Sequence, residues 1–238
     1  MYHNVGPPPP GAHLPSLYVT PAQLARHFEL LRLMGFREIS MSDALPYLRG
    51  ERGGRVAVLT FDDGYRDNLE HALPLLRRFG FGATCYVPSG ALGRFNLWDA
   101  ELLNVRKPVM DAGELRAWVA EGLEIGAHSR SHPRLSTCPP ERLRGEVRGS
   151  KEDLQDLLGC EVSQFCYPFG DYDARVLGEV REAGFVAATA MRRGRARPGD
   201  DPLQLRRVLV RGTEGIGKLL LKLATPYEDR RGQDLTGS

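Results

Sequence analysis

The chain has 238 residues, a length that one α/β barrel often fills as a single unit. Its apolar fraction of 42% and charged fraction of 26% are those of an ordinary globular protein. With 32 basic and 30 acidic residues the net charge is only +2, which gives no support for bulk binding to nucleic acid or to an anionic membrane, and no apolar run approaches the roughly 18 residues of a membrane-spanning helix.

The first half of the chain alternates helical and strand-like patterns. Thr20 can cap a first helix and Gly35 ends it, and Ser42 is the expected cap of a short second helix. The run from Val56 to Phe61 has the composition of a buried strand, and residues from about 91 to 111 look irregular. In chain order we predict helices over 21–34 and 40–48, a strand over 56–61, a helix over 67–79 ending at Gly80, and a strand over 83–89.

The second half continues the same alternation. A long amphipathic helix is predicted from Pro140 to Leu158, ended by Gly159. The basic run from Met191 to Asp200 is interpreted first as a solvated loop and second as a contact for an acidic polymer. The tail from about residue 227 is polar and is expected to be flexible. The other predicted segments are helices over 113–122, 174–183 and 215–224, and strands over 123–129, 162–168, 185–190 and 203–210.

Strands that alternate with helices indicate βα units around a parallel sheet, within a single domain spanning residues 1–238. A barrel, irregular or incomplete, suits six or seven such units, and an open doubly wound sheet is the alternative. Both architectures collect functional residues at the carboxyl ends of strands. Asp62 and Asp63 close one strand, His128 closes another, and the segment "YPFGDYD" follows a third. We therefore expect these three polar clusters to converge on one face.

Two imidazoles and one carboxylate form a common ligand set for a catalytic divalent metal. His128 and His132 flank a predicted turn, and the Asp62–Asp63 pair offers one metal ligand and one base. Taken alone, the H-x-x-x-H spacing is weak, and the aspartates could instead hold a strand-end turn. Two imidazoles favour zinc, cobalt, nickel or manganese over calcium or magnesium.

The motifs "TFDDG" (60–64), "HSRSH" (128–132) and "YPFG" (167–170) together resemble the polysaccharide deacetylase family, the NodB-homology domain of carbohydrate esterases. The resemblance runs from Met1 to about Gly212. It implies a distorted (β/α)7 barrel, a divalent metal that is usually zinc, and hydrolysis of N-acetyl groups on amino-sugar polymers. By the same resemblance Asp62 is the general base. Asp63, His128 and His132 are the metal ligands, while the Phe169 N–H is the oxyanion donor and its ring walls the acetyl pocket.

The sequence departs from the family pattern at two places. Cys166 stands where an arginine usually orients the base, and Arg207 is our candidate replacement. No histidine follows His132, so the usual late general acid is absent. The opening "MYHNV" resembles the poly-N-acetylglucosamine deacetylase subgroup, in which an early histidine takes that position, so we propose His3 as the acid. The alternative is that His3 lies on a frayed terminus without a role.

Three aromatic residues complete the predicted substrate groove: Tyr65, Tyr167 and Trp98. Trp98 is either a sugar-stacking platform or a loop anchor, whereas Trp118 is predicted to be core. Asp67 is expected to cap the helix that follows it. Cys85 and Cys166 lie in strand-like runs and are expected to be small buried hydrophobes, although a disulfide is not excluded.

The leading interpretation is a metal-dependent enzyme, a polysaccharide N-deacetylase acting on an oligomer or polymer that contains N-acetylglucosamine. The alternatives are a hydrolase of the same fold acting on another amide or cyclic imide, and a non-catalytic carbohydrate-binding domain. The start of the chain lacks the basic and apolar regions of a signal peptide, which indicates a cytoplasmic protein or a trimmed form, although the resembling family is often exported. The sequence contains no signal for oligomeric state.

Overall fold

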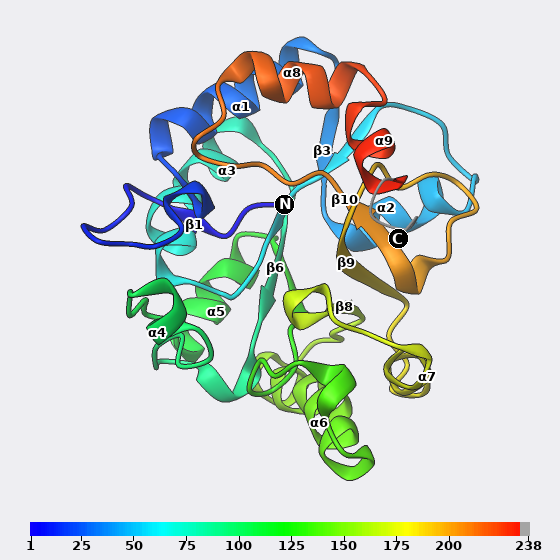
Figure 1. Cartoon of the computed structure of the whole chain (residues 1–238). Helices are drawn as coiled ribbons and strands as arrows, with labels where there is room; N and C mark the ends of the chain where they lie inside the picture. Colours follow the sequence, from blue (N-terminus) through cyan, green and yellow to red (C-terminus); the bar gives the residue numbers. More distant parts are fainter. Residues whose placement is uncertain (234–238) are drawn as a thin grey trace.

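A curled sheet of six parallel strands forms the centre of the molecule, and helices surround it (Figure 1). The computed structural model describes residues 1–233. The strands lie in the order β10-β9-β8-β7-β6-β5, and neighbours are in parallel register, as in the pairing of Thr60 with Thr84. This architecture confirms the predicted distorted barrel. The strands are β5 (Thr60–Phe61), β6 (Thr84–Val87), β7 (Glu124–Ala127), β8 (Gln164–Cys166), β9 (Ala187–Arg193) and β10 (Leu205–Arg207).

The predicted strand over 56–61 divides into two. β4 (Val56–Val58) is half-buried and pairs with β3 (Arg37–Ile39), whereas β5 is buried and pairs with β6. Leu59 joins the two strands, so β4 and β5 form one continuous extended segment. Its first half pairs with β3 and its second half with β6. The main sheet of the described chain thus has six strands, one fewer than the seven that the resemblance implies.

The N-terminal residues close the gap between β5 and the segment that follows β10. Tyr2 N–H donates to Thr60 O at 2.8 Å, and Asp62 N–H donates to Tyr2 O at 3.0 Å. On the other side the Met1 nitrogen donates to Val208 O at 3.0 Å, and Val210 N–H donates to Met1 O at 3.2 Å. Figure 1 accordingly shows the N-terminus at the centre of the molecule. The chain then continues into β1 (Asn4–Val5), which pairs with β2 (Tyr18–Val19).

Most helices begin and end where the sequence predicts. Thr20 forms a reciprocal capping box with Gln23 at the start of α1, and Gly159, with φ of 67°, ends α6. The predicted cap of α2 was wrong: Ser40, not Ser42, accepts from Asp43 N–H. The helices are α1 (Pro21–Leu33), α2 (Met41–Leu48), α3 (Leu73–Phe79), α4 (Ala100–Leu103), α5 (Ala112–Ala120), α6 (Pro140–Leu158), α7 (Ala174–Glu182), α8 (Ile216–Ala224) and α9 (Tyr227–Gln233), with a π-helical turn over Asn68–Ala72 before α3.

The main hydrophobic core lies between the sheet and the helix layer, and it includes Trp118 as predicted. The Trp118 ring is fully buried, and its indole N–H donates to Glu124 O at 3.1 Å. Cys85 and Cys166 are buried, and all four cysteines are free thiols. Within residues 1–233 no helix is both long enough and apolar enough to cross a membrane.

The C-terminal residues form α9 as far as residue 233 and make ion pairs with the basic run, contacts that the expectation of a flexible tail from 227 did not include. Glu228 is fully buried and receives two hydrogen bonds of 2.9 Å from Arg193. Asp229 pairs with Arg195 and Arg197 at 2.7 and 3.0 Å. The first interpretation of the basic run over 191–200, a solvated loop, was therefore wrong. Arginines of this run form ion pairs with acidic residues of α9. Residues 234–238 lie outside the described part of the chain.

Candidate metal centre and active site

Three side chains converge at the carboxyl ends of β5 and β7. Asp63 Oδ1 lies 3.5 Å from His128 Nε2 and 3.3 Å from His132 Nε2, and the two imidazole nitrogens are 3.1 Å apart. Bonds of about 2.0–2.2 Å to a tetrahedral ion set its ligand atoms about 3.3–3.6 Å apart. All three residues are buried. The donor types and their spacing therefore fit a divalent cation, as the motifs predict.

The backbone sets the orientation of these ligands. His128 Nδ1 donates to Cys166 O at 2.7 Å, which leaves Nε2 as the lone-pair nitrogen facing Asp63. Among residues 1–233, four of the five non-glycine residues with left-handed φ lie in the three motifs: Asp63 (72°), Ser129 (61°), His132 (57°) and Phe169 (57°). Such conformations are unfavourable for residues with a Cβ, and they concentrate at functional sites. The backbone strain thus coincides with the proposed chemistry.

Helix α6 holds the loop that carries His132. Arg130 N–H and Ser131 N–H donate to the Glu146 carboxylate at 3.0 and 2.8 Å. The Arg130 guanidinium forms two hydrogen bonds, of 2.8 and 2.7 Å, with Asp153. It packs where a Cβ on Gly149 would lie, 2.3 Å from that position. Our sequence analysis missed these residues. Glu146 stands among apolar residues on the buried stripe of α6, and a charged residue at such a position indicates a buried polar contact.

Asp62 is held away from the three ligands by Arg207. The guanidinium donates to both carboxylate oxygens, at 2.7 and 2.8 Å, and both side chains are buried. Arg207 also donates to Ala190 O and to the sulfur of Cys166, so it occupies the space beside the residue that replaces the usual arginine. Burial raises the pKa of Asp62, but the charges of Arg207 and His3 outweigh it and lower the pKa below its usual value. Arg207 thus binds the carboxylate that the resemblance assigns as the base, and its base-orienting role stays a prediction.

A second group of potential ligands, Asp62, His128 and Cys166, also lies within ligand distance. Its carboxylate is already bound by Arg207, and the Arg207 Nη2 atom lies 3.2 Å from the Cys166 sulfur. A fixed positive charge beside two of three donors opposes binding of a cation. The Asp63 group is therefore the better metal site.

His3 reaches the base through backbone pairing. Tyr2 is paired in parallel with Phe61, which places the next residues, His3 and Asp62, side by side. His3 Nε2 lies 4.0 Å from Asp62 Oδ2, and its side chain is 13% exposed. This placement contradicts a frayed N-terminus and puts an imidazole beside Asp62, the predicted base.

Aromatic rings wall one side of the metal ligands. The Trp98 ring stacks on His132 at 4.7 Å, and the Phe169 ring meets His132 edge-on at 4.6 Å. Tyr65 stacks on Trp98 and is buried, and burial together with the Asp63 charge raises its pKa. Trp98 thus packs against a predicted metal ligand, and both its loop-anchor role and sugar stacking on it stay predictions.

Two predicted roles do not match the structure. Tyr167 is fully buried and its phenol donates to Leu203 O at 2.9 Å, so its side chain does not contact the site. Asp67 makes no capping hydrogen bond and pairs instead with Lys107. A further carboxyl, Asp99, follows Trp98 and was missed. Burial, with the nearby Asp63 charge, raises its pKa to about 7.

Comparisons with known proteins agree with this geometry. The sequence profile of the family described as polysaccharide deacetylase matches residues 49–188. The chain is 29% identical over 188 residues to a chitooligosaccharide deacetylase of Bradyrhizobium sp., covering 77% of this chain and 78% of that protein. Among solved structures, IcaB from Ammonifex degensii is 25% identical with a TM-score of 0.75, covering 88% of this chain and 89% of the other.

A second solved structure shares the fold along nearly the whole chain. The deacetylase PplD of Streptococcus pyogenes, in complex with acetate, superposes with a TM-score of 0.80 at 21% identity, covering 94% of this chain and 96% of that one. The profile match spans more than half of the 238 residues and includes Asp62, Asp63, His128 and His132. The chain therefore belongs to the polysaccharide deacetylase family.

Proposed function

We propose that the chain is a metal-dependent hydrolase that removes N-acetyl groups from an oligomer or polymer of N-acetylated amino sugars. The observation that carries the proposal is the division of labour between adjacent aspartates. Asp63 faces two imidazole nitrogens at 3.3 and 3.5 Å, while Asp62 is turned to Arg207. A purely structural turn has no need for both arrangements.

Asp63, His128 and His132 would hold the ion, and two imidazoles with one carboxylate favour zinc, with cobalt, nickel or manganese as alternatives. When bound, such an ion acts as a Lewis acid and lowers the pKa of a coordinated water to about 7. Asp62 stays ionised beside Arg207 and accepts the proton of the attacking water. Burial excludes bulk solvent from this carboxylate and strengthens its interactions.

The remaining steps fall to Phe169 and His3. The backbone N–H of Phe169 is the proposed donor to the oxygen that becomes negative, and one such donor contributes about 2.7–4 kcal/mol. The His3 imidazolium, next to Asp62, is placed to protonate the departing amine. Cys166 stands where the family usually has an arginine, and Arg207 brings a guanidinium to the same place. The departure from the family pattern therefore gives no reason to prefer another amide or an imide as the substrate.

The substrate class is supported by the Bradyrhizobium relative, whose name specifies chitooligosaccharides. The test is acetate release from N-acetylglucosamine oligomers by the native chain, by chelator-treated protein and after zinc is restored. We expect activity to be lost with chelator and regained with zinc. Asp62→Asn should keep its zinc yet lose about 10²–10⁴-fold in turnover. Asp156→Asn, an exposed aspartate on α6, is the matched control. Undiminished turnover in Asp62→Asn would refute the assignment.

A further inference from the structure

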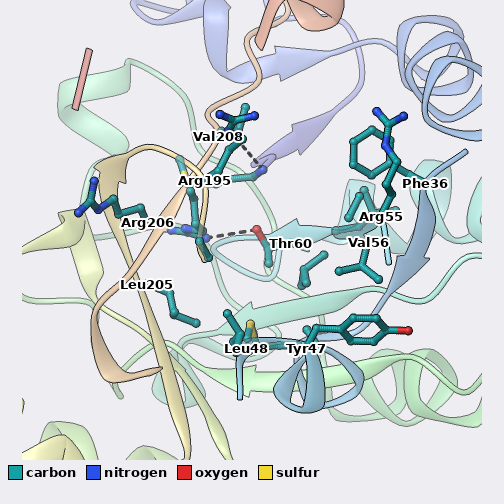
Figure 2. A pocket seen from close by; sticks show the side chains of 18 of the residues that line it. Phe36, Tyr47, Leu48, Arg55, Val56, Thr60, Arg195, Leu205, Arg206 and Val208 are labelled. Atoms are coloured by element: carbon teal, nitrogen blue, oxygen red, sulfur yellow. Dashed lines mark hydrogen bonds between the residues drawn. The ribbon is translucent and has the colours of Figure 1, made fainter. Parts of the chain in front are cut away.

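The loops that follow β7 and β8 are joined to each other at the carboxyl ends of the strands. The first loop carries His132 and continues through residues 134–138, and the second carries Phe169. None of these residues lines the cavity of about 480 Å³ that lies between β4 and β10 (Figure 2). The contacts between the two loops therefore decide how Phe169 is placed relative to His132.

The turn that contains Phe169 has a backbone conformation that needs support. Phe169 has φ of 57° and ψ of 8°, and Gly170 follows with φ of 66°. A left-handed conformation is unfavourable for a residue with a Cβ, and it persists only where the surrounding structure holds it. On one side the turn packs against β9, because a Cβ on Gly170 would lie 2.7 Å from the Met191 Cβ. Contacts with the loop of His132 supply further support.

Asp171 binds this turn to the neighbouring loop. Its carboxylate accepts the backbone N–H of Ser136 at 2.9 Å, and the Ser136 hydroxyl lies 2.8 and 2.9 Å from its two oxygens. Among the described residues the carboxylate has no other polar partner. The cap of α7 is Asp173, which accepts the Val176 N–H at 2.8 Å. The hydrogen bonds of the Asp171 side chain thus serve to join the two loops.

Two arginines reinforce this link on either side of Ser136. The Arg134 guanidinium lies 4.8 Å from the centre of the Phe169 ring. Arg175 donates to Ser136 O at 2.9 Å and to Cys138 O at 2.6 Å. The partners advance together along the chain, 134 with 169, 136 with 171 and 138 with 175, so the two segments run alongside each other.

The chemistry proposed above depends on the spacing of these loops. In that proposal the Phe169 N–H donates to an oxygen that becomes negative beside the three predicted ligand residues. Such a donor is effective when it lies about 2.7–3.1 Å from the place of that oxygen in the transition state. A misplacement of about 1 Å can cost about 100-fold in rate. The position of Phe169 relative to His132 is set across the contact between Ser136 and Asp171.

We propose that Asp171 is a positioning residue of the active site: by holding the loop of Phe169 against the loop of His132, it sets the direction of the Phe169 N–H. The inference rests on the proposed function, because this direction matters only where an acyl oxygen is bound. None of the hydrogen bonds of the Asp171 side chain reaches a predicted metal ligand or Asp62. Asp171 therefore acts through its neighbours. A merely structural link would change stability and leave kcat as it is.

The first measurement is acetate release from N-acetylglucosamine oligomers by the zinc-loaded full chain. Asp171→Ala should lower kcat and kcat/KM equally, by about 10–100-fold, because the Phe169 N–H bonds most strongly to the oxygen of the transition state. Asp171→Asn keeps one acceptor oxygen for the Ser136 N–H and should lose less. Asp173→Asn is the matched control and should keep the native kcat, because asparagine caps a helix as well as aspartate does.

Two further readouts do not depend on turnover. Zinc affinity in a competition titration should be unchanged in Asp171→Ala, because Glu146 still holds the loop of His132. In hydrogen exchange of the metal-free protein, the amides of Ser136 and Gly170 should exchange at least about fivefold faster in Asp171→Ala. The amide of Ser131, which donates to Glu146, should exchange at the native rate.

A double variant tests whether Asp171 acts through Ser136. Ser136→Ala should add little to the loss of kcat in Asp171→Ala, because both substitutions break the same contact. Fully additive losses would overturn the proposal, and so would a native kcat in Asp171→Ala or unchanged exchange at Gly170. If the native chain releases no acetate, the proposed function fails and this inference fails with it. If the native chain is active and Asp171→Ala equals it, the inference alone fails.

Discussion

The buried pair of Arg207 and Asp62 gives the sharpest test of the site, because it links fold stability to catalysis. The substitution Arg207→Met replaces the guanidinium with an apolar group and keeps an unbranched side chain, so it removes the charge. It deletes the 2.7 and 2.8 Å hydrogen bonds to Asp62 and those to Ala190 O and Cys166. Asp62 is then left as a buried carboxylate with no cationic partner except His3, 4.0 Å away.

Removing one partner of a buried ion pair destabilises a protein by about 3–5 kcal/mol, because the remaining charge is desolvated without compensation. We expect that loss for Arg207→Met, and a similar one for Asp62→Asn, which leaves the guanidinium buried. The double variant should be more stable than the sum of the two losses predicts, by about 2–3 kcal/mol. The folded-state pKa of Asp62 is lowered, so its stabilising contribution is present above the unfolded pKa of about 4 and is lost as pH falls below that value.

Urea unfolding of the native chain, the two single variants and the double variant at pH 7 measures this coupling. The difference in free energy of unfolding between the native chain and Arg207→Met should become smaller when the urea series is repeated near pH 3. Zinc content should be unchanged in Arg207→Met, because Asp63, His128 and His132 remain, while turnover falls. A loss below about 1 kcal/mol, the value of an exposed pair, would refute the buried ion pair. Strictly additive losses would refute it as well.

Three more predictions concern residues around the ligands. His3→Gln should lower turnover by about 10²–10⁴-fold with zinc content intact, whereas His13→Gln, an exposed residue, should leave turnover unchanged. Glu146→Gln should weaken zinc binding about 10–100-fold in a competition titration, because the amide has no negative charge and only one acceptor oxygen for the donors of the His132 loop, and Glu141→Gln on the exposed face of α6 should not. Burial raises the pKa of Asp99 to about 7, so its carboxylate destabilises the fold increasingly between pH 4 and 7. Asp99→Asn should therefore gain thermal stability relative to the native chain as pH rises over that interval, and a pH-independent difference would contradict this reasoning.

Local signals in the sequence predict the elements well where the determining contacts are also local. Thr20 caps α1 with a partner three residues away, and Gly159 ends α6 through its own backbone conformation. The convergence of Asp63, His128 and His132 was predicted in the same way, because these residues follow apolar runs and the parallel sheet brings strand ends together. Arg207 was a reasonable candidate because the strand "LQLRRVLV" contains two adjacent arginines. Successive side chains of a strand point to opposite faces, so one of the two is directed into the barrel.

The predictions that failed depend on partners far along the chain. Whether Tyr167 points to the site or to the core is decided by the facing Leu203, 36 residues later. The tail is polar by composition, yet Glu228 is buried because Arg193 lies opposite it, 35 residues earlier. Asp67 has the chemistry of a helix cap, but the ammonium of Lys107 offers its carboxylate a stronger partner. No pattern within a short window contains these pairings.

The placement of His3 shows how barrel closure and catalysis depend on one another. Among the described residues, the His3 side chain has no polar partner other than Asp62. Its position follows from the hydrogen bonds of Tyr2 to Thr60 and Asp62 and of Met1 to Val208 and Val210. The same bonds hold β5 and the segment after β10 at the spacing that lets Arg207 cross the gap to Asp62. The residues proposed as acid, base and orienting arginine are therefore all positioned by one short parallel segment, Met1 to His3.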